Sequence, residues 1–217
     1  MKIVIATVAG LAVAASAGVQ TEGYSGSFSL ATTNWNQSFQ IAGFDTQNGN
    51  RELVEVNIRL AGEVQGDAKA ESLDAAPAEI FLALQATLTL ELMATNTQLA
   101  EVIPVVNTSF NADAFDGNID FGGTSGVSLL GLQGFGNVNE SSTDAGVLAQ
   151  FSDVAFVDLI ANAAGSSFGS GAGNLITQFA TAAALEYEVE YKYRLVPTPG
   201  AASLLAVGGL ACIRRRR

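Results

Sequence analysis

The chain has 217 residues, of which 21 are acidic and 10 are basic, with no histidine and one cysteine. The lack of histidine excludes Ser-His-Asp and Cys-His catalytic groups and ordinary zinc sites. The acidic excess argues against nucleic acid or an anionic lipid surface as a partner of the protein.

The first 17 residues have the pattern of a secretory signal peptide. A charged start at Lys2 precedes the apolar run Ile3–Ala14, and Ala15-Ser16-Ala17 is an A-x-A exit. We expect the export machinery to cleave this signal-peptide helix between Ala17 and Gly18, so residues 1–17 take no part in the fold. The alternative is a buried N-terminal strand.

Residues 18–195 are sufficient for one secreted domain with a sizeable core. Of the 10 basic residues, Lys2 and the four terminal arginines lie in the end segments, which leaves five against all 21 acids and a net charge of −16. Such a surface keeps a secreted domain soluble and could attract divalent cations. This part of the chain has no cysteine that could form a disulfide.

Alternation of apolar and polar residues predicts several strands, because a helical face would repeat every 3.6 residues instead. The clearest lie at Leu53–Leu60, Ile80–Leu92 and Leu185–Arg194. Weaker strands are predicted at Tyr24–Thr32, Trp35–Ile41, Val102–Asn107, Val127–Leu132 and Asn174–Ala180.

Turn-rich stretches separate these strands at Gly43–Gly49, Asp113–Gly126, Gly134–Gly146 and Gly165–Gly173. Strands with one wet face, joined by such loops, predict an all-β fold, an antiparallel β-sandwich. We expect a short helical turn within Phe151–Ile160, crossing one end of the domain.

One acidic loop carries the best candidate for a metal site. Asp113, Asp116, Asn118 and Asp120 offer the oxygen ligands that suit Ca²⁺. Ala114 occupies a position that an EF-hand requires for a ligand, so the favoured alternative is a turn solvated by its own Asp and Asn side chains. We expect no other cofactor.

Exposed aromatic residues would be a second kind of site. Trp35 and Tyr187 are the candidates for stacking on a sugar, and core packing is the favoured role for each. A two-carboxylate glycosidase is the enzyme class that the composition leaves open. We expect the protein not to be an enzyme.

The order and spacing of several segments form a recognisable pattern. These segments are Asn34–Phe39, Phe44-Asp45, the Gly49 turn, Leu53–Leu60, Phe121–Gly126, Gly173–Leu175 and the Tyr-rich Glu186–Tyr193. From Gly23 to Arg194 the pattern resembles the choice-of-anchor E domain, a secreted bacterial family found upstream of interchangeable surface-anchoring signals. The resemblance implies display at the surface or in the matrix, and it transfers no catalytic residues.

Residues 196–217 have three parts: the motif Val196-Pro197-Thr198-Pro199-Gly200, the apolar run Ala201–Ile213, and Arg214-Arg215-Arg216-Arg217. A helix over the apolar run would rise roughly 20 Å, which is short of the roughly 30 Å of a membrane core. We therefore expect a short hydrophobic helix with transient membrane contact. The arginines act as a cytoplasmic stop, with the domain on the far side of the inner membrane.

This arrangement resembles a PEP-CTERM sorting signal, which exosortases recognise in some Gram-negative envelopes. The usual motif is Val-Pro-Glu-Pro, and Thr198 replaces the glutamate here. The resemblance implies an exosortase-type processing enzyme as a partner, with cleavage near Pro199-Gly200. The alternative is a short tail anchor, and Cys212 is either a lipidation site or a small helix residue.

Two functions follow from these observations. The first is a structural protein of the cell surface, outer envelope or extracellular matrix, retained with exopolysaccharide after its tail is processed. The second is a carbohydrate- or Ca²⁺-binding module displayed by the same route.

Overall fold

The computed structural model describes residues 18–196. The expected signal peptide up to Ala17 and the segment from Pro197 to Arg217, with their two expected helices, lie outside the described residues. The elements in chain order are β1 (Gln20–Thr32), β2 (Trp35–Ala42), β3 (Arg51–Ser72), β4 (Ala78–Leu92), β5 (Thr97–Val102), β6 (Val105–Ala112), β7 (Gly126–Ser142), α1 (Ala145–Phe151), β8 (Phe156–Gly165), β9 (Phe168–Ser170) and β10 (Leu175–Leu195).

The strands form one continuous sheet through antiparallel pairs, in the order β1-β10-β3-β7-β6-β4-β8-β2, with β5 and β9 also paired to β4. The prediction of an antiparallel all-β fold is confirmed. One register pair, Val105 with Phe135, joins β6 to β7. At the two ends of the order, Phe28 of β1 contacts Phe39 of β2, with ring centroids 5.5 Å apart.

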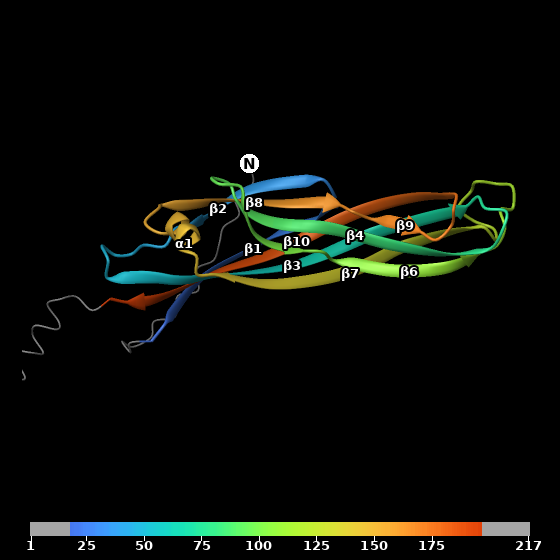
Figure 1. Ribbon diagram of the computed structural model, residues 1–217. Helices are drawn as coiled ribbons and strands as arrows, with labels where there is room; N and C mark the ends of the chain where they lie inside the picture. The colour runs from blue at the N-terminus through green and yellow to red at the C-terminus, as the bar shows by residue number, and fades with distance from the viewer. Residues whose placement is uncertain (1–17, 197–217) are drawn as a thin grey trace, which may run out of the picture.

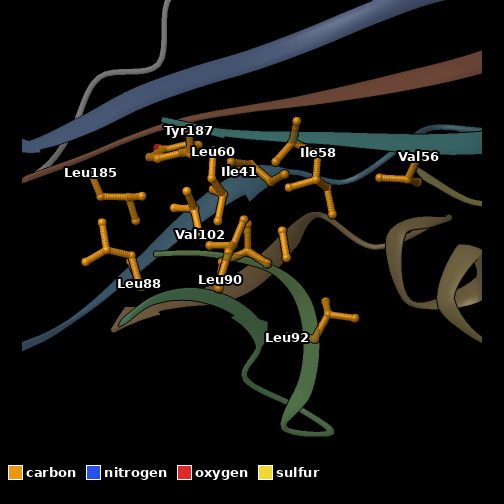
Figure 2. Close-up of a cluster of buried hydrophobic side chains, with 14 of the residues drawn as sticks. Ile41, Val56, Ile58, Leu60, Leu88, Leu90, Leu92, Val102, Leu185 and Tyr187 are labelled. Atoms are coloured by element: carbon orange, nitrogen blue, oxygen red, sulfur yellow. The ribbon is translucent and has the colours of Figure 1, made fainter. Parts of the chain in front are cut away.

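The sheet folds over, so that β3 and β10 lie across the core from β4 (Figures 1 and 2). Alternate residues of each strand point inward because successive strand side chains point to opposite faces. Leu60 and Leu185 from one side meet Leu88 and Leu90 from the other (Figure 2). These four side chains are at most 1% exposed, and the burial of such apolar surface is the main stabilising contribution to the fold.

The molecule is long and has two distinct ends (Figure 1). We call one end the tail pole: β1 and β3 begin there, β10 ends there, and Gln20 pairs with Tyr193. We call the other end the distal pole, which consists of loops 73–77, 113–125 and 171–174. Strand β3 has 22 residues, which at about 3.3 Å per residue span roughly 70 Å between the poles.

The helix prediction was wrong in position. The helix is Ala145–Phe151, and Asp144 caps it by accepting hydrogen bonds from the backbone nitrogens of Gly146 (2.9 Å) and Val147 (3.0 Å). In the stretch expected to be helical, Phe151–Ile160, only Phe151 is in the helix and the residues from Phe156 onward belong to β8. Every second residue of β8 from Val157 to Ala163 is buried.

The loop prediction for Gly134–Gly146 was also wrong, because β7 continues to Ser142. A Cβ atom on Gly134 would lie 2.5 Å from the backbone carbon of Val105, and one on Gly136 would lie 2.9 Å from Cγ2 of Val102. These glycines permit close approach within the strand and do not mark a turn. The predicted strand Val102–Asn107 is divided at Pro104, which has no N–H for a ladder.

Candidate functional site

The tail pole is the place where both ends of the described chain leave the sheet. Gly18, on the mature side of the expected signal cleavage, lies two residues before β1. Val196, the first residue of the expected sorting motif, follows β10 directly, and its N–H donates to the carbonyl oxygen of Asn50 at 2.8 Å. Gly18 and Val196, the described residues next to the two expected end signals, therefore lie at the same end of the molecule. The remaining motif residues and Ala17 lie outside the described part of the chain.

Arg51 connects three strands at this pole. Its Nη2 atom donates to Oε2 of Glu22 on β1 at 2.6 Å. Its guanidinium carbon lies 3.9 Å from the ring centroid of Tyr193 on β10 and 4.5 Å from that of Phe44. The side chain is only 10% exposed, which strengthens both cation–π contacts.

Further contacts hold the last residues of β10. Nε and Nη2 of Arg194 donate to the two carboxylate oxygens of Glu52 at 2.8 and 3.0 Å. The hydroxyl of Tyr193 donates to Oε1 of Gln20 at 2.9 Å. We call this set the tail clamp: Gln20, Glu22, Asn50, Arg51, Glu52, Tyr193, Arg194 and Val196.

The loop beside the tail clamp has an unusual backbone. Gln47, Asn48 and Gly49 have φ of 51°, 58° and 84°, so three consecutive residues are left-handed, a conformation that L side chains adopt at a cost. Asp153, itself at φ 56°, fixes the loop because its Oδ1 accepts from both N (3.0 Å) and Oγ1 (2.7 Å) of Thr46. These two hydrogen bonds hold the pKa of the Asp153 carboxyl below its ordinary value.

An open depression of about 550 Å³ separates this loop from the end of β10. It is lined by Thr46, Asn48, Gly49, Arg51, Glu52, Leu53, Ser152, Asp153 and Val196. The first residue of the expected sorting motif is thus part of the wall of a surface hollow.

Tyr191 and the two candidates for sugar stacking pack in or against the core. The Tyr191 hydroxyl donates to the carbonyl oxygen of Ala42 at 3.0 Å. Burial, followed by the nearby Tyr24 and Glu22 groups, raises its pKa far above the usual range. Tyr187, one sugar-stacking candidate, is 4% exposed, and the other, Trp35, packs against Phe28 with ring centroids 5.8 Å apart. Core packing, the favoured expectation for both, is confirmed.

The distal pole is organised around a buried carboxylate. Glu71 is fully buried on β3. Its Oε1 accepts from the Ser125 hydroxyl at 2.6 Å, and its Oε2 accepts from the Phe121 N–H at 2.7 Å. Ser125 is also fully buried, and its carbonyl oxygen accepts from the Ser72 N–H at 2.9 Å. Glu71 therefore attaches loop 113–125 to the end of β3.

The acidic residues of this loop serve its own turns. Oδ1 of Asp116 accepts from the N–H of Asn118, and Oδ1 of Asp120 accepts from the N–H of Gly122, both at 2.9 Å. The backbone N–H of Asp113 donates to the carbonyl oxygen of Thr124 at 2.9 Å. Within residues 18–196, no three His, Cys, Asp or Glu side chains gather closely enough to hold a metal ion. Ca²⁺ binding at Asp113, Asp116, Asn118 and Asp120 stays a prediction, and these contacts match the solvated-turn alternative.

Sequence reasoning missed Glu71 and, apart from Val196, the residues of the tail clamp. Arg51 is 29 positions from Glu22, and Arg194 is 142 positions from Glu52. Only the strand register brings these pairs together, so no local spacing could reveal them. Glu71 lies beyond the predicted strand end at Leu60, so the sequence pattern did not mark it either.

The described residues form an antiparallel all-β body with both of their ends at one pole. The chain matches no family model and no curated protein sequence. Within residues 18–196, no helix combines the length and the apolar character needed to cross a membrane.

Similar solved structures come from infectious bursal disease virus. The Gx strain structure has 14% identity and a TM-score of 0.15, and covers 83% of this chain and 42% of its own. The T13 viral particle has 13% identity and a TM-score of 0.13, and covers 83% of this chain and 41% of its own. The chain thus spans less than half the length of these viral chains, and TM-scores this low carry no argument about fold or function.

Proposed function

We propose that this chain is an exported bacterial protein whose body is displayed at the cell surface or in the extracellular matrix after its C-terminal tail is processed. In this proposal, the tail from Val196 to Arg217 is a sorting signal for an exosortase-type transpeptidase. The body is retained with exopolysaccharide and does no catalysis. The observation that carries the proposal is that Gln20 and Tyr193 pair at the same pole from which Val196 leaves.

This arrangement suits a protein that has a membrane-directed segment at each end. An N-terminal signal and a C-terminal tail that leave from one pole can both face the membrane while the body stands away from it. The distal pole would then project roughly 70 Å outward, as the length of β3 implies.

The charges of the body also fit this proposal. Four of the five basic side chains of residues 18–196 form ion pairs. The pairs are Arg51–Glu22, Arg59–Glu188, Lys192–Glu55 and Arg194–Glu52. The body therefore has little free positive charge with which to bind an anionic membrane surface. Retention would depend on the tail or on the group that replaces it.

We further propose that the body is a two-layer β-sandwich of the choice-of-anchor E kind, closed along one side by the Val105–Phe135 pair. The folded-over sheet and the segment order from Gly23 to Arg194 support this assignment.

Mass spectrometry of the protein isolated from the envelope of its host tests the sorting proposal. We expect chains that begin at Gly18 and end near Pro199-Gly200. Only intact chains ending at Arg217 would contradict processing and would favour a tail anchor.

The second candidate function is a displayed carbohydrate- or Ca²⁺-binding module. Its support is weaker, because Tyr187 is buried and the carboxylates of Asp116 and Asp120 accept hydrogen bonds from their own loop. Glycan arrays and calorimetry with Ca²⁺ on the processed protein separate the two candidates. Saturable binding would favour the module.

A further inference from the structure

The sheet is hydrogen-bonded up to the residue that precedes the first proline of the tail. Leu195 pairs with Arg51, and the N–H of Val196 donates to Asn50. The next residue is Pro197, whose nitrogen has no hydrogen to continue such a ladder. The hydrogen-bonded sheet therefore reaches the first residue of the expected sorting motif, and no spacer separates the two.

A chain-cleaving enzyme needs an accessible, extended substrate on both sides of the scissile bond. A peptide segment held in a sheet is cleaved only when it opens locally, and the rate then follows the population of the open state. Residues Tyr193–Val196 lie just upstream of the expected cleavage position, and all four are held by the tail clamp or the ladder.

We propose that the tail clamp limits the rate of tail processing, so that cleavage requires the last residues of β10 to separate from β3. This inference rests on the proposed function. The fold would then set where the mature chain ends, because residues upstream of Val196 are withheld from the enzyme while the body stays folded.

The Arg194–Glu52 pair offers the mildest way to loosen the clamp. Its side chains are 60% and 49% exposed, so their pairing contributes only modestly to the fold. Replacement of Glu52 by Gln should raise the population of the open state, and hence the cleavage rate, about 1.5- to 5-fold. The Arg59–Glu188 pair is a matched control, because its side chains are 60% and 43% exposed on the same two strands but away from the tail.

The experiment measures the cleavage rate of the full chain in membranes that contain the host processing enzyme. The variants are Glu52→Gln, Glu188→Gln, a Gly-Ser-Gly-Ser insertion between Val196 and Pro197, and the same insertion after Asn118 in the distal loop. We expect faster cleavage for Glu52→Gln and, by a larger factor, for the insertion after Val196. The two controls should match the wild type.

Equal rates for the wild type, Glu52→Gln and the insertion after Val196 would overturn the inference while leaving the sorting proposal intact. If no variant is cleaved, the sorting proposal fails. In that case hydrogen exchange of the purified full chain tests whether the tail clamp holds the end of β10 against β3. Slow exchange of the Val196 amide, accelerated by Glu52→Gln but not by Glu188→Gln, would support it, and unprotected exchange in the wild type would overturn it.

Discussion

At the scale of single residues, Glu71 shows how a charged side chain can be fully buried in this protein. Both of its carboxylate oxygens accept hydrogen bonds, one from Ser125 and one from Phe121. A buried polar group costs free energy unless it is paired in this way. Because both partners belong to loop 113–125, the residue holds that loop against the end of β3.

Replacement of Glu71 by Gln should therefore destabilise the distal pole. One acceptor oxygen becomes an NH₂ group and the carboxylate charge is lost, so the two charge-assisted hydrogen bonds from Ser125 and Phe121 cannot both be kept. We expect a loss of about 1–3 kcal/mol in the free energy of unfolding and earlier protease cleavage within loop 113–125. Chemical denaturation and limited proteolysis measure these effects. Glu79→Gln, at an exposed position of the same pole, is the control, and equal behaviour of the two variants would contradict the prediction.

Asp153 gives the protein a pH dependence at the opposite pole. The Thr46 hydroxyl and N–H lower the pKa of this carboxyl below its ordinary value of 3.8. A carboxyl with a lowered folded-state pKa stabilises the fold above its unfolded value, and this stabilisation is lost as the pH falls through the folded-state pKa. Loop 45–50 should thus stay ordered at pH 4 and loosen at lower pH.

Carboxyl NMR titration checks this expectation directly. The Asp153 midpoint should lie below 3.8, and Thr46→Ala should move it upward because both the side-chain donor and the loop geometry change. A wild-type midpoint at or above 3.8 would contradict the role given to Thr46.

At the scale of elements, the sequence predicts strands well where large apolar residues alternate. Strand β4 agrees with its predicted bounds to within two residues. Strand β3 extends to Ser72, far past the predicted end at Leu60. The prediction ended too early because Gly62, Gly66 and Ala68 weaken the alternation of apolar and polar residues there. Strand β10 likewise unites two strands that were predicted separately.

Glycine has two structural roles in this chain, and sequence alone did not distinguish them. Gly49 accompanies a turn, as predicted, whereas Gly134 in β7 admits a neighbouring backbone. The residues around each glycine do not reveal which role it has. The difference is that the backbone of Val105 on the neighbouring strand lies against Gly134. For the same reason the clamp at the tail pole could not be predicted from sequence, because only the pairing of distant strands brings its residues together.

Replacement of Gly134 by Ala tests whether this glycine is needed for the close approach of the neighbouring strand. The added Cβ would meet the Val105 backbone at 2.5 Å, next to the single pair that joins β6 to β7. We expect a loss of about 1–3 kcal/mol, measured by urea denaturation. In Gly23→Ala the nearest atom would be 3.7 Å away, so that variant should be nearly neutral. A neutral Gly134→Ala would show that β6 and β7 can separate without cost.

At the scale of the whole molecule, the long strands make an elongated body (Figure 1). A compact domain of about 180 residues would have a radius of gyration of about 16 Å. A rod whose length is set by the 22 residues of β3 should instead give about 20 Å. Small-angle X-ray scattering of the chain from Gly18 to Val196 measures this value, and a result near 16 Å would contradict the extended shape.

The pairing of β10 with β3 also has a mechanical consequence. All 21 residues of β10 have a partner on β3, and the two strands are antiparallel. A force that pulls the C-terminal end against the distal pole acts along the strands, so it shears many hydrogen bonds at once. A force that separates the C-terminal end of β10 sideways from the start of β3 breaks them one at a time. A body attached by its C-terminal end and pulled from its far end would thus resist tension in its strongest direction.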